Sequence, residues 1–346
     1  MDTRIQNKTS HLMRVWSARL VVRTLKFLPL SFALFLSLFS NSFNTQAKAE
    51  SQKVIAITEI VQHPSLEQAR TGLLDELKEN GYEEDKNLKV IQQNAQGSIA
   101  NAVLIAKKFV SMKPDAIIPI STPSAQAVSN AAKSDQIPIV FSSVTDPVAA
   151  GLVQDISELH PKITGAIDFP PLKEGLEFIR TIVPHIKTIG LLYSAGEANS
   201  LKTVELLKEE IKDQLKIIET TVPDSNRVGQ ALSALIGKVD AVYIPSDNTV
   251  FAAMPKVVKI SREHKLPIFS SDPDSVKQGV LACVGYTQYA VGRTAGKILV
   301  KILKGEKNLK IEKPEHAEIF VNQISAEKMD ILVPETMFGA EIKIVK

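Results

Sequence analysis

The chain has 346 residues, of which 44% are hydrophobic and 23% are charged, the composition of an ordinary globular protein. This length favours two lobes over one compact domain. The net charge is +3, but residues 1–49 hold seven of the 41 basic residues and one of the 38 acidic residues. The remaining chain has 34 basic and 37 acidic residues, a net charge of −3. This charge gives no indication of a nucleic-acid partner.

The N-terminal segment has the layout of a secretory signal peptide. Basic residues from Arg4 to Lys26 precede an apolar run, residues 27–39, and a polar stretch that ends in Ala47-Lys48-Ala49. As a helix, the apolar run is about 20 Å long, too short to span a bilayer comfortably. We expect cleavage near Ala49, and a retained N-terminal anchor is the alternative. Because no cysteine lies near this position, there is no lipobox, and we expect a free periplasmic protein.

Short β-branched runs then alternate with longer amphipathic stretches along the chain. The first series has expected strands at 54–58, 88–92, 116–120 and 138–141, and expected helices at 66–79, 99–112 and 124–133. The second has helices at 172–183, 197–215, 226–236 and 249–264, and strands at 188–192, 217–221, 241–244, 267–269 and 280–284. A further helix is expected at 290–303. The only cysteine, Cys283, cannot form an internal disulfide and reads as a small buried strand residue.

Two βα series of similar length predict an α/β protein with two Rossmann-like lobes built on parallel sheets. The first crossing between lobes is expected near Asp168, where Pro170 and Pro171 interrupt regular structure. Lobe 1 is expected to comprise 50–168 plus about 288–318. Lobe 2 is expected to comprise 169–287 plus about 319–346.

Polar residues follow the expected strands of the first lobe, where ligands bind in sheets of this kind. Thr122 and Ser124 stand at a helix start, whose unpaired N–H groups suit a carboxylate. Ordinary helix capping explains them equally well. Ser142, Thr145 and Asp146 follow the next strand, with a simple Asp-Pro turn as the alternative.

The second lobe offers carboxylates at the same places. We expect its ligand contacts to be Tyr193, Glu197, Asn199, Asp247, Asn248 and Asp272. Hydroxyls on one lobe and carboxylates on the other match a zwitterion, with Asp247 as the favoured ammonium partner. The alternative for Asp247 is a helix N-cap. Tyr193 and Tyr286 are expected to stack on the ligand, or else to pack in the core or hinge.

Several runs along the chain together resemble one family of ABC-transporter substrate-binding proteins, which includes tryptophan- and aromatic-amino-acid-binding lipoproteins of Gram-positive bacteria. The runs are 62–66, 93–97, 121–125, 137–153, 190–200, 239–250, 269–275, and 285–286 followed by 292–293. Two of them contain His63 and Gln96, which complete the set of expected ligand contacts. The relatives carry a lipobox cysteine that this chain lacks, which puts membrane tethering in doubt.

The resemblance implies a type I periplasmic-binding-protein fold, with two lobes joined by three crossing strands. It also implies delivery of an amino acid, aromatic ones favoured, to an ABC permease in the inner membrane that an ATPase drives. We expect a monomer with no cofactor, no metal and no catalytic activity. A binding module for a sensor kinase or chemoreceptor is the first alternative. A two-lobed α/β enzyme is the second, although no nucleophile motif such as G-x-S-x-G or H-E-x-x-H occurs.

Overall fold

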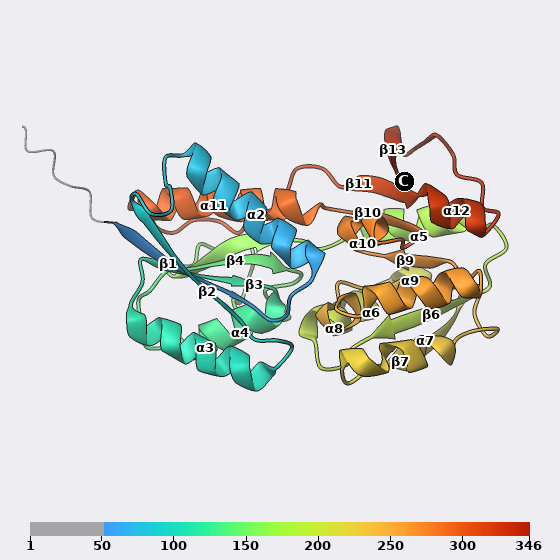
Figure 1. Cartoon of the computed structure of the whole chain (residues 1–346), viewed down its shortest axis with the longest axis horizontal. Helices are drawn as coiled ribbons and strands as arrows, with labels where there is room; N and C mark the ends of the chain where they lie inside the picture. Colours follow the sequence, from blue (N-terminus) through green and yellow to red (C-terminus); the bar gives the residue numbers. More distant parts are fainter. Residues whose placement is uncertain (1–51) are drawn as a thin grey trace, which may run out of the picture. The chain divides into compact units, whose positions relative to one another are not determined.

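The computed structural model describes residues 52–346, so the expected signal peptide and its cleavage near Ala49 lie outside the described residues. The described chain forms two β-sheets, each with helices packed on it (Figure 1). We call the five-stranded sheet with its helices lobe 1 and the eight-stranded sheet with its helices lobe 2.

All strands of lobe 1 are parallel and lie in the order β2-β1-β3-β4-β5. Apolar residues fill these strands, and every residue of β3 is buried, as expected for a sheet covered on both faces. The strands are β1 (Lys53–Glu59), β2 (Leu88–Asn94), β3 (Ala116–Ile120), β4 (Ile139–Val144) and β5 (Ile163–Ile167). The helices are α2 (Pro64–Glu79), α3 (Ile99–Met112), α4 (Thr122–Ala131) and α11 (Gln288–Leu303).

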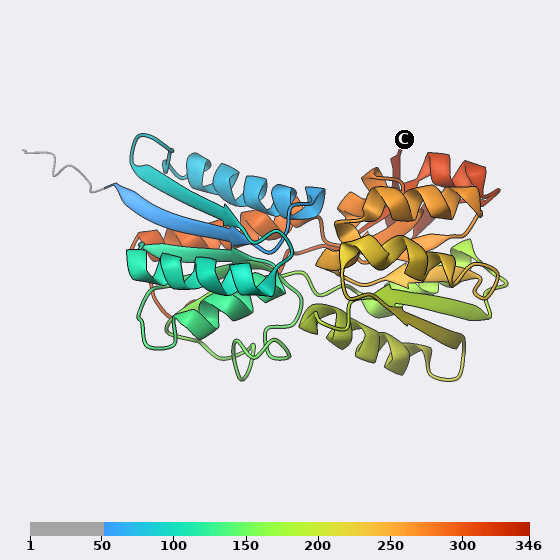
Figure 2. The ribbon, with the colours of Figure 1, turned by 60° about the horizontal axis from the view of Figure 1, so that its bottom comes forward.

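Helices α2 and α11 cover one face of the lobe 1 sheet, and α3 and α4 cover the other, which comes forward in Figure 2. Glycines let α2 and α11 approach at backbone distance. A Cβ atom on Gly292 would overlap the carbonyl of Ala69, and one on Gly72 would overlap the carbonyl oxygen of Tyr289. Lobe 1 is therefore completed by a helix from near the end of the chain.

The lobe 2 sheet is mixed, which corrects the expectation of parallel strands in both lobes. Its order is β12-β13-β11-β10-β9-β8-β6-β7. Strand β11 runs antiparallel to β10, with Gly285 opposite Glu318, and β12 runs antiparallel to β13. The chain leaves lobe 2 at the carboxyl end of β10, passes through α11, and re-enters beside that same end, so β11 must run backwards along β10.

The elements of lobe 2 have the following bounds. The strands are β6 (Thr188–Tyr193), β7 (Lys216–Thr221), β8 (Ala241–Ile244), β9 (Ile268–Ser270), β10 (Ala282–Gly285), β11 (Glu318–Asn322), β12 (Thr336–Met337) and β13 (Ala340–Val345). The helices are α5 (Leu172–Ile182), α6 (Ala198–Ile211), the 3₁₀ turn η1 (Ser225–Arg227), α7 (Val228–Ser233), α8 (Asn248–Phe251), α9 (Met254–Glu263), α10 (Pro273–Lys277) and α12 (Gln323–Lys328).

One expected helix, 249–264, is two helices, α8 and α9. Pro255 stands in the first turn of α9, where a proline is tolerated. Within one continuous helix its ring would clash with the carbonyl of Phe251, so the helix breaks. The free cysteine Cys283 is buried in β10, as expected. Within residues 52–346, no helix has the length and apolarity to span a membrane.

Candidate functional site: a cleft between the lobes

An inner pocket lies where residues after the strands of lobe 1 meet residues of lobe 2. Its volume is about 20 Å³, room for about one water molecule. Lobe 1, with α11 and the crossing after β5, contributes His63, Ser65, Leu66, Thr122, Ser143, Thr145, Asp168 and Gln288; lobe 2 contributes Asn199, Ser246, Asn248 and Phe251.

The two lobes touch directly at this pocket. The His63 Nε2 atom lies 3.4 Å from Asn248 Oδ1, and the Ser65 hydroxyl donates to Asp272 Oδ2 at 2.5 Å. Direct contacts and a pocket of water size are the features of a closed cleft. A ligand larger than a water molecule therefore enters only when the lobes separate.

Asp168 is the carboxylate that faces the inner pocket. It follows β5 directly and is 6% exposed. Its Oδ1 accepts from the Thr145 hydroxyl at 3.0 Å, and its Oδ2 accepts from Gln288 Nε2 at 2.9 Å. Burial raises the pKa of Asp168, and these two hydrogen bonds oppose the rise. Each oxygen keeps a second lone pair for a ligand donor.

The start of α4 forms the hydroxyl side of the pocket. Thr122 is the first residue of this ten-residue helix, and its side chain is 1% exposed. The Thr122 Oγ1 atom is buried without a hydrogen-bond partner. Ser143 Oγ, at the end of β4, donates to Gln288 Oε1 at 2.6 Å and so helps to orient the amide that holds Asp168. An unpaired hydroxyl beside a helix N-terminus suits an anionic group.

The uncharged ring of His63 and the ring of Phe251 form one wall of the pocket. His63 stands at the N-cap of α2, and its ring meets the Phe251 ring edge-on with centroids 5.8 Å apart. Burial lowers the pKa of His63 to about 4, so the imidazole is uncharged at neutral pH. Its Nδ1 atom is buried without a partner.

Asp247 is the N-cap of helix α8, which was the alternative to its expected role as the partner of a ligand ammonium. Its Oδ1 accepts the Val250 N–H at 2.8 Å, and its Oδ2 accepts the Ser194 N–H and the Ser200 hydroxyl, both at 2.6 Å. The side chain is fully buried and lines neither cavity of the cleft. Burial and the nearby charge of Glu197 raise the pKa of Asp247 to about 7. Its expected contact with a ligand ammonium has no geometric basis here.

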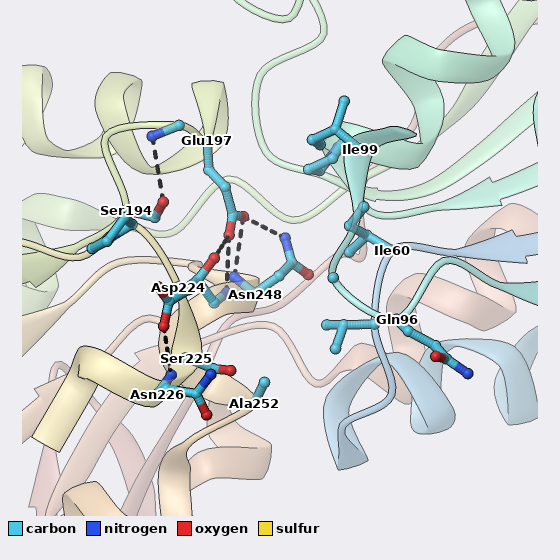
Figure 3. Close-up of a pocket in the computed structure, with 16 residues that line it drawn as sticks. Ile60, Gln96, Ile99, Ser194, Glu197, Asp224, Ser225, Asn226, Asn248 and Ala252 are labelled. Atoms are coloured by element: carbon cyan, nitrogen blue, oxygen red, sulfur yellow. Dashed lines mark hydrogen bonds between the residues drawn. The ribbon is translucent and has the colours of Figure 1, made fainter. Parts of the chain in front are cut away.

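The other two carboxylates expected on lobe 2, Asp272 and Glu197, also accept hydrogen bonds from the protein itself. Asp272 caps α10 through the N–H groups of Asp274 and Ser275, and burial raises its pKa to about 7. Glu197 Oε1 accepts from the backbone and hydroxyl of Thr249, and its Oε2 accepts from the side chain of Asn199. Oε2 also accepts from the backbone and side chain of Asn248 (Figure 3). Glu197 thus ties the loop before α6 to the start of α8.

The remaining expected residues divide between the cleft and the protein interior. Asn199, Asn248, Thr122, Thr145 and His63 line the inner pocket, and Gln96 lines the outer cavity described below. Ser124 and Ser142 are buried but line neither cavity, and Asp146 accepts the N–H groups of Val148 and Ala149 in a turn.

The expected aromatic stacking residues lie outside both cavities. Tyr193 donates its hydroxyl to Glu219 at 2.8 Å, and burial together with this hydrogen bond raises the pKa of Tyr193 to about 12. Tyr286 packs in the lobe 1 core. The last residue of β6 therefore turns toward its neighbour strand β7 and not into the cleft.

The sequence did not single out several pocket residues: Ser65, Leu66, Ser143, Asp168, Ser246, Phe251 and Gln288. Asp168 follows β5 directly, but this strand was not predicted from the sequence, so Asp168 was interpreted only as a crossing point. Gln288 and Phe251 lie inside helices and do not follow a strand directly.

An outer cavity of about 340 Å³ adjoins the inner pocket and shares Asn248 with it (Figure 3). Lobe 1 lines it with Ile60, Val61, Gln96, Gly97, Ile99 and Pro123; lobe 2 lines it with Ser194, Gly196, Glu197, Pro223, Asp224, Ser225, Asn226, Asn248, Thr249 and Ala252. Among the residues that the structure describes, no cluster of His, Cys, Asp and Glu is arranged to hold a metal ion.

This cleft between two α/β lobes is the site of a substrate-binding protein. Residues 54–344 match the family of ABC transporter substrate binding proteins, and the chain belongs to that family. Over 312 residues, which are 89% of each chain, it is 37% identical to a tyrosine-binding protein of Clostridioides difficile (strain R20291). The predicted type I periplasmic-binding fold is confirmed.

Two solved structures allow the state of the cleft to be compared. An ABC domain from Streptococcus pneumoniae in complex with L-Trp is 31% identical with a TM-score of 0.80, over 85% of this chain and 100% of that one. A ligand-free, open substrate-binding protein with adhesive properties from Clostridium difficile is 38% identical with a TM-score of 0.63, over 85% and 99%. The better superposition on the complex, despite its lower identity, agrees with a closed cleft.

Proposed function

We propose that this protein is the solute-binding component of an ABC importer and that it captures an amino acid, with aromatic ones favoured, between its lobes. The observation that carries the proposal is the pairing of a buried carboxylate, Asp168, with the hydroxyl start of α4 at Thr122, in one pocket. Those two features are complementary to the two charges of a zwitterion. The tyrosine-binding relative and the L-Trp complex support the ligand class.

In this proposal, Asp168 binds the ligand ammonium. Thr145 and Gln288 hold the carboxylate from one side and leave lone pairs for the ligand on the other. A ligand ammonium beside Asp168 favours the charged carboxylate, and the neutral His63 ring adds no positive charge that would repel the ammonium.

The ligand carboxylate binds at the start of α4. The free Thr122 hydroxyl is a donor that the folded protein leaves without a partner, and the helix N-terminus adds a partial positive charge. The ligand carboxylate would therefore accept a hydrogen bond from the buried Thr122 hydroxyl, and the helix N-terminus would stabilise the negative charge of the ligand.

The family and the N-terminal segment support a proposal for the physiological setting. We propose export by a signal peptide cleaved near Ala49, a monomer in the periplasm, and delivery of the ligand to an inner-membrane permease. The lobes close on the ligand about the three connecting segments, and the permease binds the closed form.

Calorimetric titration with L-tyrosine, L-tryptophan and the des-amino analogue 3-(4-hydroxyphenyl)propionate tests the proposal. Asp168→Asn should weaken tyrosine binding at least about 30-fold, equivalent to about 2 kcal/mol, because the buried ammonium loses its charged partner. The matched control Asp155→Asn, on an exposed loop of lobe 1, should bind like wild type.

The des-amino analogue tells whether the lost interaction is with the ammonium. Wild-type protein should prefer tyrosine strongly over the analogue, and Asp168→Asn should largely abolish that preference. Binding of sugars without amino acids, or normal tyrosine affinity in Asp168→Asn, would overturn the proposal.

A further inference from the structure

We propose that the outer cavity is a second subsite of the cleft, which receives the side chain of the amino acid whose ammonium and carboxylate occupy the inner pocket. This inference rests on the proposed function and adds to it the place and the chemical class of the ligand side chain.

Size separates the two parts of the cleft. The inner pocket has about 20 Å³ and carries the polar groups of Thr122, Thr145 and Asp168, whereas the outer cavity has about 340 Å³. A volume of that order lies in the range of small-molecule sites. Of the two parts, only the outer cavity therefore has room for a large side chain, whereas the buried Asp168 carboxylate and the unpaired Thr122 hydroxyl line the inner pocket.

The side chain of Asn248 is the partition between the two parts. It lines both, and Glu197 anchors its Nδ2 atom at 2.6 Å from the lobe 2 side (Figure 3). Its Oδ1 atom makes only the long 3.4 Å contact with His63 across the cleft. When the lobes separate, this contact breaks and the passage beside Asn248 opens, with the amide oxygen free to accept from the ligand.

On the lobe 1 side, consecutive residues line the two parts. Thr122 faces the inner pocket and Pro123 faces the outer cavity. A ligand with its carboxylate at Thr122 can therefore extend its side chain past Pro123 without leaving the cleft.

The lining of the outer cavity defines the side chains that fit. Ile60 and Ile99 form an apolar wall on lobe 1, and Ala252 lies across the cavity from them on lobe 2 (Figure 3). Pro123 also lines the lobe 1 side. Asp224 and Asn226 offer acceptors at the lobe 2 edge, and none of the described residues that line the cavity is Lys, Arg or His. The subsite suits a bulky apolar side chain that is neutral or carries a hydrogen-bond donor at its tip, and it disfavours acidic side chains.

Two matched pairs of variants test the subsite. Ala252→Leu narrows the cavity, and its control Ala234→Leu makes the same change at an exposed helix C-cap with similar backbone angles. Ile99→Ala removes part of the apolar wall, and its control Leu104→Ala truncates an exposed residue of the same helix, so neither endangers the fold.

Calorimetric titration of each variant with L-phenylalanine, L-tyrosine and L-tryptophan gives the readout. Ala252→Leu should weaken binding most for the largest side chain that wild type accepts, at least about tenfold, and Ile99→Ala should weaken it severalfold. Both controls should match wild type.

The outcomes separate the two proposals. If wild type binds these ligands and neither Ala252→Leu nor Ile99→Ala changes their affinities, the subsite is overturned and the proposed function stands. An equal loss for every ligand in Ala252→Leu also overturns the subsite, because it indicates a disturbed inner pocket. Wild-type protein that binds no amino acid overturns both.

Discussion

Asp247→Asn should destabilise the protein and leave amino-acid binding nearly intact. The asparagine Oδ1 atom still caps α8 by accepting the Val250 N–H, since Asn and Asp are equal caps. The new NH₂ group instead faces two former donors, the Ser194 N–H and the Ser200 hydroxyl. The hydroxyl can rotate and accept, but the backbone N–H cannot.

The magnitude follows from that one stranded group. Ser194 is buried, and an unsatisfied buried N–H costs about 1–3 kcal/mol. The substitution also removes a buried negative charge close to Glu197, which offsets part of this cost. Burial and the charge of Glu197 both disfavour the ionised Asp247, as its raised pKa indicates. We therefore expect the free energy of unfolding to fall by less than this full cost, by about 1–2 kcal/mol.

Urea unfolding of the ligand-free protein, followed by circular dichroism, measures the stability, and tyrosine titration measures the binding. Asp213→Asn, which removes an exposed charge from the same lobe, is the control for net charge. Unchanged stability together with a 30-fold loss of tyrosine affinity would refute this reasoning and make Asp247 the ammonium partner.

Two further changes test the cleft and the lobe 1 core. The pKa of His63 is about 4 in the folded protein and ordinarily near 6.5. Between pH 7 and pH 5 the unfolded chain therefore binds a proton at His63 and the folded protein does not, which lowers the free energy of unfolding by about 2 kcal/mol. His63→Gln should not show this loss of stability between pH 7 and pH 5, which urea unfolding of both proteins at the two pH values measures. The raised pKa values of Asp247 and Asp272 change the stability in the opposite direction in both proteins, so their effect cancels in the comparison. Gly292→Ala should cost about 1–3 kcal/mol in urea unfolding, because its methyl group overlaps Ala69. Gly175→Ala, with open space within α5, should cost nothing, and equal stabilities of the two variants would contradict the close packing of α2 and α11.

Periodicity and β-branched runs predicted most strands and the fold class, because a strand such as β3 is buried along its whole length and carries that burial in its composition. The reversed strand β11 was not predictable from local pattern. Its direction is set by the place where the chain returns from α11, which is a tertiary property. The division of 249–264 had a local signal, Pro255, that was overlooked.

The location of the candidate site was predictable from the sequence, but the roles of its individual residues were not. The rule that ligands bind after parallel strands led to Thr122, Thr145 and Asn248, which do line the pocket. The same rule led to Asp247 and Asp272, whose side chains bend back onto the N–H groups of the next helix. An aspartate after a strand and before a helix can serve either purpose, and only its direction, which the neighbouring backbone decides, separates the two.

The late position of α11 bears on how the chain acquires its structure. A growing chain that has emerged as far as residue 168 contains the whole lobe 1 sheet but lacks the helix that packs on α2 and covers β4 and β5. That face, together with the core residues Ala69 and Leu73 of α2, stays exposed to solvent until α11 is complete at residue 303. Lobe 1 is thus completed only after most of lobe 2 has been made, although the strands of lobe 1 are made first. Contacts between residues so far apart in sequence slow folding, which prolongs the interval in which the chain remains extended enough to be threaded through a pore or captured by a chaperone.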